Sequence, residues 1–237
     1  MPFETQRDVF KFRGHLAFPA TASGAGSPFV IADTSAAGAP TFGGKSGGGY
    51  QMKFASTSEV ENLCLYFGDV LAYDIDDLIR MEIIVKQGQA TLNAATQLAF
   101  GMTSARNAAI DSIAAAALFR LVGDNNIVVE SDDGTTDRDD VSTGLVLSNE
   151  YRRYAIDFAT GIQSKEPPAT SVGGKGNVQF FGGNANGSLR RVASGTLFDM
   201  SAYSDGLQPF VQLQKTADVN VNGIEILQVS VEYKQVA

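Results

Sequence analysis

Short apolar runs separated by glycine- and asparagine-rich segments fill residues 170–233 of this chain. Residues 178–181 and 189–192 flank the segment Gly-Gly-Asn-Ala-Asn-Gly, a pattern typical of a β-hairpin. Residues 207–214 and 224–233 are two further apolar runs of strand length. Few side chains in this region are suited to catalysis, so the pattern favours a scaffold or a binding protein over an enzyme.

Alternation of apolar and polar residues extends the strand prediction toward the N-terminus. Strands are expected at residues 50–54, 62–67, 78–86, 98–102, 118–122, 127–130 and 151–158. In the third of these, Met81, Ile83 and Val85 share one parity, as in a strand with one buried face. The apolar parity of the last strand shifts between Ile226 and Leu227, which predicts a bulge there or burial on both faces.

A single helix is expected, over residues 104–117. This segment is rich in alanine, begins with Ser104 as a capping residue, and places Ile110 and Ile113 three positions apart. About ten to twelve strands with one short helix predict an all-β fold, an antiparallel β-sandwich.

The N-terminal segment differs in composition from the rest. Glycine, alanine and proline dominate residues 1–49, with short strands expected only at 9–13 and 29–31. Such a segment buries too little surface to order by itself, so we expect an extended arm at 1–49 and a sandwich domain at 50–237. Six phenylalanines of the arm are candidate partner-binding residues, with core strand positions as the alternative: Phe3, Phe10, Phe12, Phe18, Phe29 and Phe42.

Charge and cysteine content exclude several classes of function. The formal net charge of −8 argues against nucleic acid as a partner. The sequence has no secretory signal and no apolar stretch of the roughly 18 residues that a membrane span needs, so no membrane contact is expected. One cysteine, Cys64, allows no intrachain disulfide, which suits folding in a reducing cytosol. Its apolar neighbours predict that it is a small buried hydrophobic residue.

The search for reactive groups gives one candidate metal site and no catalytic residue or cofactor. The only histidine, His15, lies in the arm, away from any nucleophile motif. Carboxylates cluster in the segment 132–140, and such clusters on a glycine-containing turn can bind Ca²⁺. Arg138 and Gly144 break the EF-hand pattern, so a solvated hairpin tip is the first interpretation. A Ca²⁺ site is the second, with candidate ligands Asp132, Asp133, Asp137 and Asp139.

Five segments of the chain carry a family resemblance. They are Phe-Arg-Leu-Val-Gly-Asp-Asn at 119–125, Glu-Ser-Asp-Asp-Gly-Thr at 130–135, Tyr-Arg-Arg-Tyr-Ala-Ile-Asp at 151–157, Asn-Val-Gln-Phe-Phe at 177–181 and Leu-Gln-Pro-Phe-Val-Gln-Leu-Gln-Lys at 207–215. Together they resemble structural proteins of tailed-phage virions that have a lectin-like, laminin-G or jelly-roll, β-sandwich. The resemblance covers about residues 100–235 and implies a jelly-roll-like fold.

The resemblance leads to three hypotheses about function. The first is a non-enzymatic capsid decoration (cement) protein, assembled in the bacterial host cytoplasm onto the outer surface of the virion head. Its partners would be the major capsid protein and further copies of itself, with a trimer favoured. The second is a tail-associated, carbohydrate-binding or receptor-binding module whose segment 132–140 holds Ca²⁺. The third is a hydrolase acting through paired carboxylates, for which the sequence names no pair.

Overall fold

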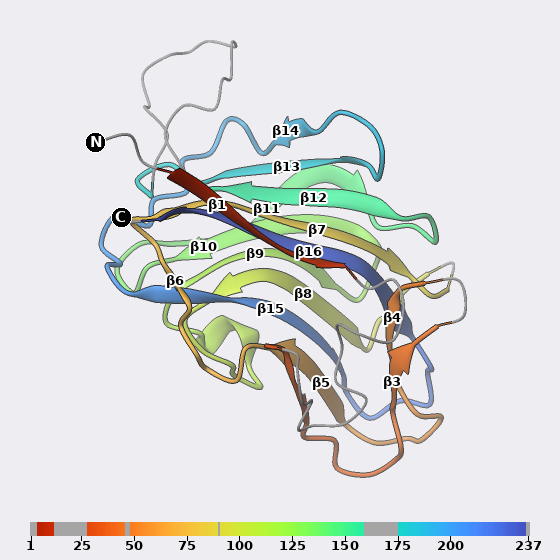
Figure 1. Ribbon diagram of the computed structural model, residues 1–237. Coiled ribbons are helices and arrows are strands. Elements are labelled where there is room, and N and C mark those ends of the chain that lie inside the picture. The colour runs from red at the N-terminus through yellow and green to blue at the C-terminus, as the bar shows by residue number, and fades with distance from the viewer. Residues whose placement is uncertain (1–3, 12–27, 46–47, 90, 159–174, 236–237) are drawn as a thin grey trace.

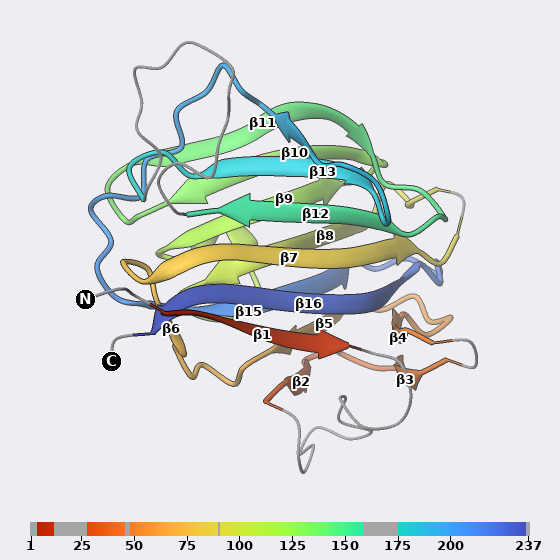
Figure 2. The same cartoon turned by 45° about the horizontal axis from the view of Figure 1, so that its top comes forward.

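The computed structural model describes residues 4–11, 28–45, 48–89, 91–158 and 175–235. Two antiparallel sheets pack face to face, and the described parts of both chain ends lie in sheet A (Figures 1 and 2). Sheet A has the order β14-β13-β12-β7-β16-β4-β3, with β1 also pairing β16. Sheet B has the order β11-β10-β9-β8-β15-β5-β2, with β6 also pairing β15. The predicted antiparallel sandwich is therefore confirmed.

The strands of sheet A are β1 (Glu4–Lys11), β3 (Thr41–Gly44), β4 (Tyr50–Lys53), β7 (Leu78–Gln87), β12 (Arg152–Asp157), β13 (Gln179–Asn184), β14 (Arg190–Val192) and β16 (Gly223–Gln235). The strands of sheet B are β2 (Val30–Asp33), β5 (Glu61–Tyr66), β6 (Tyr73–Asp74), β8 (Thr96–Thr103), β9 (Ala116–Val122), β10 (Asn126–Asp132), β11 (Asp137–Val146) and β15 (Gly206–Lys215). Among the described residues, no helix is long and apolar enough to cross a membrane.

The alternation read from the sequence sets which face of each strand is buried. Met81, Ile83 and Val85 of β7 point into the sandwich and are at most 1% exposed. The predicted bulge in the last strand is confirmed, because the pairing of β16 with β7 shifts register between Ile226 and Gln228. This shift keeps the apolar residues on both sides of the bulge facing the core.

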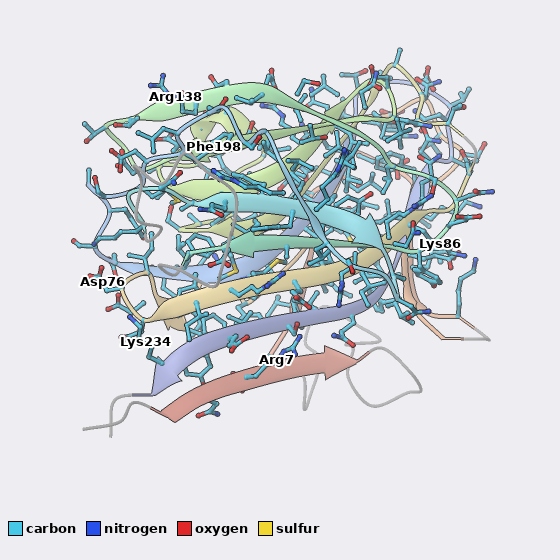
Figure 3. All side chains as sticks on the ribbon, turned by 90° about the horizontal axis from the view of Figure 1, so that it is seen from above. Arg7, Asp76, Lys86, Arg138, Phe198 and Lys234 are labelled. Carbon is cyan, nitrogen blue, oxygen red and sulfur yellow. The ribbon has the colours of Figure 1, made fainter. Side chains whose placement is uncertain are left out.

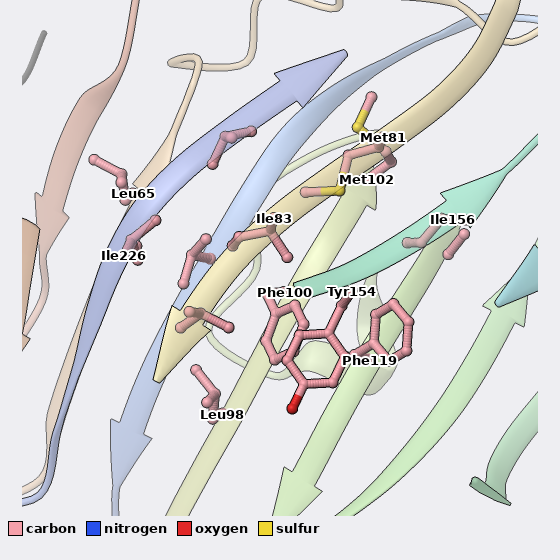
Figure 4. Close-up of a cluster of buried hydrophobic side chains, with 14 of the residues drawn as sticks. Leu65, Met81, Ile83, Leu98, Phe100, Met102, Phe119, Tyr154, Ile156 and Ile226 are labelled. Carbon is pink, nitrogen blue, oxygen red and sulfur yellow. The ribbon is translucent and has the colours of Figure 1, made fainter. Parts of the chain in front are cut away.

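Aromatic rings fill the centre of the core between the sheets. Phe100 stacks on Phe119 with ring centroids 5.3 Å apart, and Tyr154 of sheet A packs against both (Figure 4). Phe180 meets Phe119 edge to face, and Phe198 packs behind Phe180. Each buried ring contributes roughly 1.5–3 kcal/mol, so this cluster fixes how the two sheets sit on each other.

The predicted helix over residues 104–117 is wrong. A three-residue 3₁₀ turn, η1 (Ile110–Ser112), lies within a strap that we define as residues 104–115, and β9 already begins at Ala116. The outer face of sheet B explains the difference, since Ile110 and Ile113 pack there with Leu118 and Phe210. Burying two isoleucines on that sheet outweighs the modest helix propensity of the alanines.

Residues of the predicted arm contribute strands to both sheets. In the described part of 1–49, β1 pairs β16, β2 pairs β5, and β3 pairs β4. Phe29 is 1% exposed and belongs to the core, and Phe42 is half-buried against it. Of Phe10 only the backbone is described, in β1, while Phe3, Phe12, Phe18 and His15 lie outside the described residues. Cys64 is fully buried, as predicted.

A buried cation joins two loops at one end of the sandwich. Lys215, the last residue of β15, is fully buried, and its ammonium lies 3.0 Å from the buried Glu61 carboxylate. The ammonium also donates to four backbone carbonyls at 2.8–3.2 Å, those of Ala55, Thr57, Asp218 and Asn220. A single charged side chain thus holds the β4–β5 and β15–β16 connections together.

Replacing Lys215 with Met removes the cation and leaves the Glu61 carboxylate buried without its partner. We expect the free energy of unfolding to fall by about 3–5 kcal/mol, measured by urea denaturation. Lys175→Met is the control, because its ion pair with Asp76 is partly exposed and should contribute below about 1 kcal/mol. Equal losses in the two variants would contradict a structural role for the buried cation.

Candidate functional site

An acidic cleft opens on the outer face of sheet B, between the β10–β11 hairpin and the strap. It is lined by Ile110, Asp111, Ile113, Ala116, Glu130, Ser131, Asp132, Asp137 and Asp139. A bulge explains the density of carboxylates, because the register shift in the β10–β11 pairing sets residues 139 and 140 opposite Glu130. Most of the predicted acidic segment is therefore gathered here, together with two acidic residues that the prediction did not include.

Arg120 of β9 is the buried counter-ion of the cleft. Its Nη1 donates to Glu130 Oε2 at 3.0 Å and also contacts the Asp111 carboxylate of the strap. Burial raises the pKa of Glu130 to about 7 although Arg120 opposes this rise, and Asp111 and Asp140 raise it further. Carboxyl groups that titrate near neutrality are common in functional sites. The neighbouring side chains and the volume of the cleft therefore decide whether Glu130 could serve a ligand.

The four candidate Ca²⁺ ligands have separate roles in the structure. Loss of hydration, and then the hydrogen bond and charge of Asp139, raise the pKa of Asp137 to about 6. Asp132 accepts a hydrogen bond from the backbone amide of Gly134 at 2.7 Å. Asp133 is a structural anchor of the turn, accepting backbone amide hydrogen bonds from Thr135, Thr136 and Ala202. Among the described residues, no three His, Cys, Asp or Glu side chains are placed to hold a metal ion.

Size limits what the acidic cleft can bind. Its volume is about 20 Å³. A single water needs roughly 10–15 Å³, so the cleft has room for one water and none for a sugar ring. We therefore describe it as an ionic cluster, with Arg120 and Glu130 buried at its base, that fastens the strap to sheet B.

Glu130 makes stability depend on pH. Its pKa rises on folding from 4.5 to about 7, so the stability it contributes is complete below the lower value and is lost as pH rises through the upper one. Glu130→Gln should therefore remove part of the fall in unfolding free energy between about pH 5 and about pH 8. Urea denaturation across this range measures the difference. Glu150→Gln, at an exposed carboxylate, should run parallel to the wild type, and a parallel curve for Glu130→Gln would contradict the assignment.

A larger pocket lies on the opposite side of the sandwich, where β1 and β16 of sheet A meet β6 of sheet B. We call it the edge pocket; its volume is about 560 Å³, and Arg7, Asp8, Pro28, Phe67, Ala72, Tyr73 and Tyr233 line it. Figure 3 shows Arg7 on β1 and Arg138 of the acidic hairpin at opposite sides of the molecule. The edge pocket and the acidic cleft are therefore separate sites.

A continuous row of aromatic rings leads from the core to the edge pocket. Phe29 meets Phe67 edge to face at 4.7 Å, Phe67 lies 6.0 Å from Tyr73, and Tyr73 lies 5.2 Å from Tyr233. The other rings of this row are buried, and Tyr233 is half-buried. The rings give the pocket an apolar floor whose geometry is fixed by packing in the core.

Asp8 supplies the polar group on this floor. Its Oδ2 accepts a hydrogen bond from the Tyr73 hydroxyl at 3.1 Å. Burial, followed by the charge of Asp8, raises the pKa of both Tyr73 and Tyr233, so both hydroxyls remain protonated donors. Arg7 stands at the rim and is held at 3.1 Å from Glu82. The pocket thus combines aromatic surface with a carboxylate and hydroxyls.

Gln208 of β15 sets the position of Phe67. Its buried side-chain oxygen accepts the backbone amides of Phe67 and Asp69, each at 3.1 Å, and its nitrogen donates to Asp69 Oδ1. Asp69 takes a left-handed conformation, with φ of 61°, which turns the chain sharply after β5. This turn carries the chain from Phe67 to β6. The buried Gln208 thus holds Phe67 directly and fixes the backbone that leads to Tyr73.

Sequence reasoning missed the edge pocket. None of its lining residues was a predicted site residue, and they come from separate segments near residues 7, 28, 67–73 and 233. Phe29, a predicted partner-binding residue, lies beneath the pocket as part of its aromatic support. No local motif marks such a site, because strand pairing over long sequence separations assembles it.

Comparisons with known proteins identify the fold. The sequence matches no protein-family model and no curated protein. A protein of unknown function from Shewanella oneidensis MR-1 is similar in structure, with a TM-score of 0.62, 11% identity, and coverage of 98% of this chain and 89% of that one. A β-glucanase from Bacillus licheniformis has a TM-score of 0.53, 12% identity, and coverage of 97% and 98%.

The carbohydrate recognition domain of Emp47p has a TM-score of 0.54 and 11% identity, with coverage of 95% of this chain and 98% of that domain. At these identities the likeness concerns the fold alone. The chain therefore has the lectin-like, jelly-roll sandwich that the sequence predicted.

Proposed function

We propose that this chain is a non-enzymatic carbohydrate-binding module that holds a sugar in the edge pocket. The observation that carries the proposal is the aromatic floor of Tyr73 and Tyr233 around the Asp8 carboxylate. A sugar ring presents apolar C–H faces and a rim of hydroxyls, so it needs an aromatic surface beside hydrogen-bonding groups. The edge pocket places both within one cavity.

The dimensions of the edge pocket suit this ligand. Its volume of about 560 Å³ lies within the range of roughly 300–1,000 Å³ typical of small-molecule sites. Asp8 can accept hydrogen bonds from sugar hydroxyls, and the hydroxyls of Tyr73 and Tyr233 can exchange hydrogen bonds with them. The acidic cleft, with room for one water, offers no comparable space.

Two of the similar structures support the proposal because their own names refer to carbohydrates. One is a glucanase and the other is a carbohydrate recognition domain, and both share the sandwich. We propose a non-enzymatic module because of the carboxyl groups that line the edge pocket. The carboxyls with raised pKa, Glu130 and Asp137, lie in the acidic cleft, whereas the edge pocket contributes one carboxylate, Asp8. A two-carboxylate glycoside hydrolysis needs a second carboxyl group within reach of the same bond.

A more specific part of the proposal concerns the position of the module in a phage virion. A sugar site favours the tail-associated, receptor-binding form of the phage hypothesis. The decoration form, in which a trimer binds the major capsid protein on the capsid surface, rests on the family resemblance alone. Both forms place the chain in a virion assembled in the bacterial cytoplasm.

Tyr233→Ala tests the sugar site. Removing this half-buried ring should weaken binding at least tenfold, because stacking surface and one hydroxyl are lost together. A glycan array with neutral and acidic oligosaccharides selects the ligand, and calorimetry with it measures the loss. Tyr151→Ala is the matched control, since Tyr151 lies on the outer face of sheet A beside Glu225. Unchanged binding by Tyr233→Ala, or no glycan bound by the wild type, would overturn the proposal.

The copy number per virion separates the two phage forms. Mass-spectrometric counting should give a few to tens of copies per particle if the module is part of the tail. Hundreds of copies would favour decoration of the head, and particles lacking the chain would contradict both forms.

A further inference from the structure

Asp8 is a carboxylate of the edge pocket that has no positively charged partner. It lies opposite Val231 of β16, a core residue, so its side chain is on the side of sheet A that faces sheet B. Arg7, the preceding residue, lies on the outer side, where its guanidinium donates to Glu82 and Ser230. Among the residues that the structure describes, no lysine or arginine forms an ion pair with Asp8.

Two tyrosine hydroxyls are turned to the Asp8 carboxylate. Tyr73 donates to Asp8 Oδ2 at 3.1 Å. Burial, and then the charge and the hydrogen bond of Asp8, raise the pKa of Tyr233, so its hydroxyl is turned to the same carboxylate. Tyr73 is 4% exposed and mainly holds Asp8 in place, whereas Asp8 and Tyr233 are half-buried and can contact a ligand. A ligand in the pocket therefore meets oxygen lone pairs on both residues.

The rest of the pocket lining offers few hydrogen-bond donors. Pro28 has no backbone N–H. The amide of Ala72 donates to the Val70 carbonyl, and the amide of Phe67 donates to the Gln208 side chain. The guanidinium at the rim is bound on the outer face of sheet A. Acceptors predominate among the polar groups of the pocket, so a well-matched ligand should mainly donate.

An ammonium group has the donor chemistry that this pocket lacks. It carries three N–H donors and no acceptor, whereas a hydroxyl carries one donor and two acceptor lone pairs. A hydrogen bond between an ammonium and a carboxylate is roughly twice as strong as one between neutral groups. The ring of Tyr233 adds cation–π attraction, and the net charge of −8 attracts cations to the protein.

We propose that the edge pocket selects an amino sugar, a sugar ring with a free ammonium group, which Asp8 binds as its counter-ion beside the Tyr233 ring. The inference rests on the proposed carbohydrate-binding function and adds the class of sugar. A neutral sugar would leave the charge of Asp8 uncompensated, and an acidic sugar would be repelled by it.

Three β-1,4-linked tetrasaccharides test the choice of ligand, because they share one backbone and differ only in the group on carbon 2. Glucosamine carries an ammonium there, N-acetylglucosamine an acetamide and glucose a hydroxyl. Calorimetry at about pH 6, where the amine keeps its proton, measures the three affinities. The wild type should bind the glucosamine tetramer about tenfold more tightly than either uncharged tetramer.

Two variants and a control locate this preference in the pocket. Asp8→Asn keeps the shape of the side chain and removes its charge, so the ratio of glucosamine to glucose affinity should fall close to one. Tyr233→Phe keeps the ring and removes one acceptor, so the ratio should fall about threefold. Glu59→Gln removes the same charge from an exposed site in the β4–β5 connection and should keep the wild-type ratio. Near-ultraviolet circular dichroism checks folding, and Tyr233→Phe remains decisive if Asp8→Asn misfolds.

The outcomes separate this inference from the proposed function. Equal affinity of the wild type for the three tetramers overturns the ammonium assignment and leaves the sugar site standing. A preference that Asp8→Asn retains would arise from net charge alone and overturns it too, as does a wild type that binds no glucosamine tetramer. Glycan binding that Tyr233→Ala leaves unchanged would instead show that the edge pocket is not the sugar site.

Discussion

Burial of β15 on both faces is the constraint on which most of this structure depends. Its inner residues lie in the core, and its outer face is packed beneath the strap. A strand buried in this way leaves no water for its polar side chains, so each must find partners elsewhere in the fold. Gln208 binds the turn after β5, Gln212 binds the strap, and Lys215 binds two loops. The polar residues of one strand thereby organise three separate regions of the surface.

This arrangement explains why the edge pocket lies at the start of β15. At its start, the Gln208 contacts hold the turn that carries Phe67 and leads to Tyr73, and the edge pocket forms there. Toward its end, Gln212 donates to the strap, and its own side-chain oxygen stays unpaired beneath it. The core makes the edge pocket rigid, because Phe67, Tyr73 and Tyr233 pack ring against ring.

Features that depend on neighbouring residues could be predicted from the sequence, whereas features that depend on contacts between distant segments could not. Strand alternation, the bulge after Ile226 and the burial of Cys64 follow from neighbouring residues alone. The helix over 104–117 failed because local propensity cannot register the apolar surface of Leu118 and Phe210 that the strap covers. The edge pocket had no signal, because Asp8 and Tyr73 are joined by a contact across 65 positions.

The acidic hairpin shows how a correct motif can have a different role from the one it suggests. The sequence made a solvated hairpin tip the first interpretation of these carboxylates and a Ca²⁺ site the second. In the structure the turn uses Asp133 for its own backbone amides, and Arg120 supplies the positive charge beside Glu130. A guanidinium is always charged and forms directed hydrogen bonds, so it can fasten the strap through Asp111. The charge that remains on this face is negative, and it therefore repels anions.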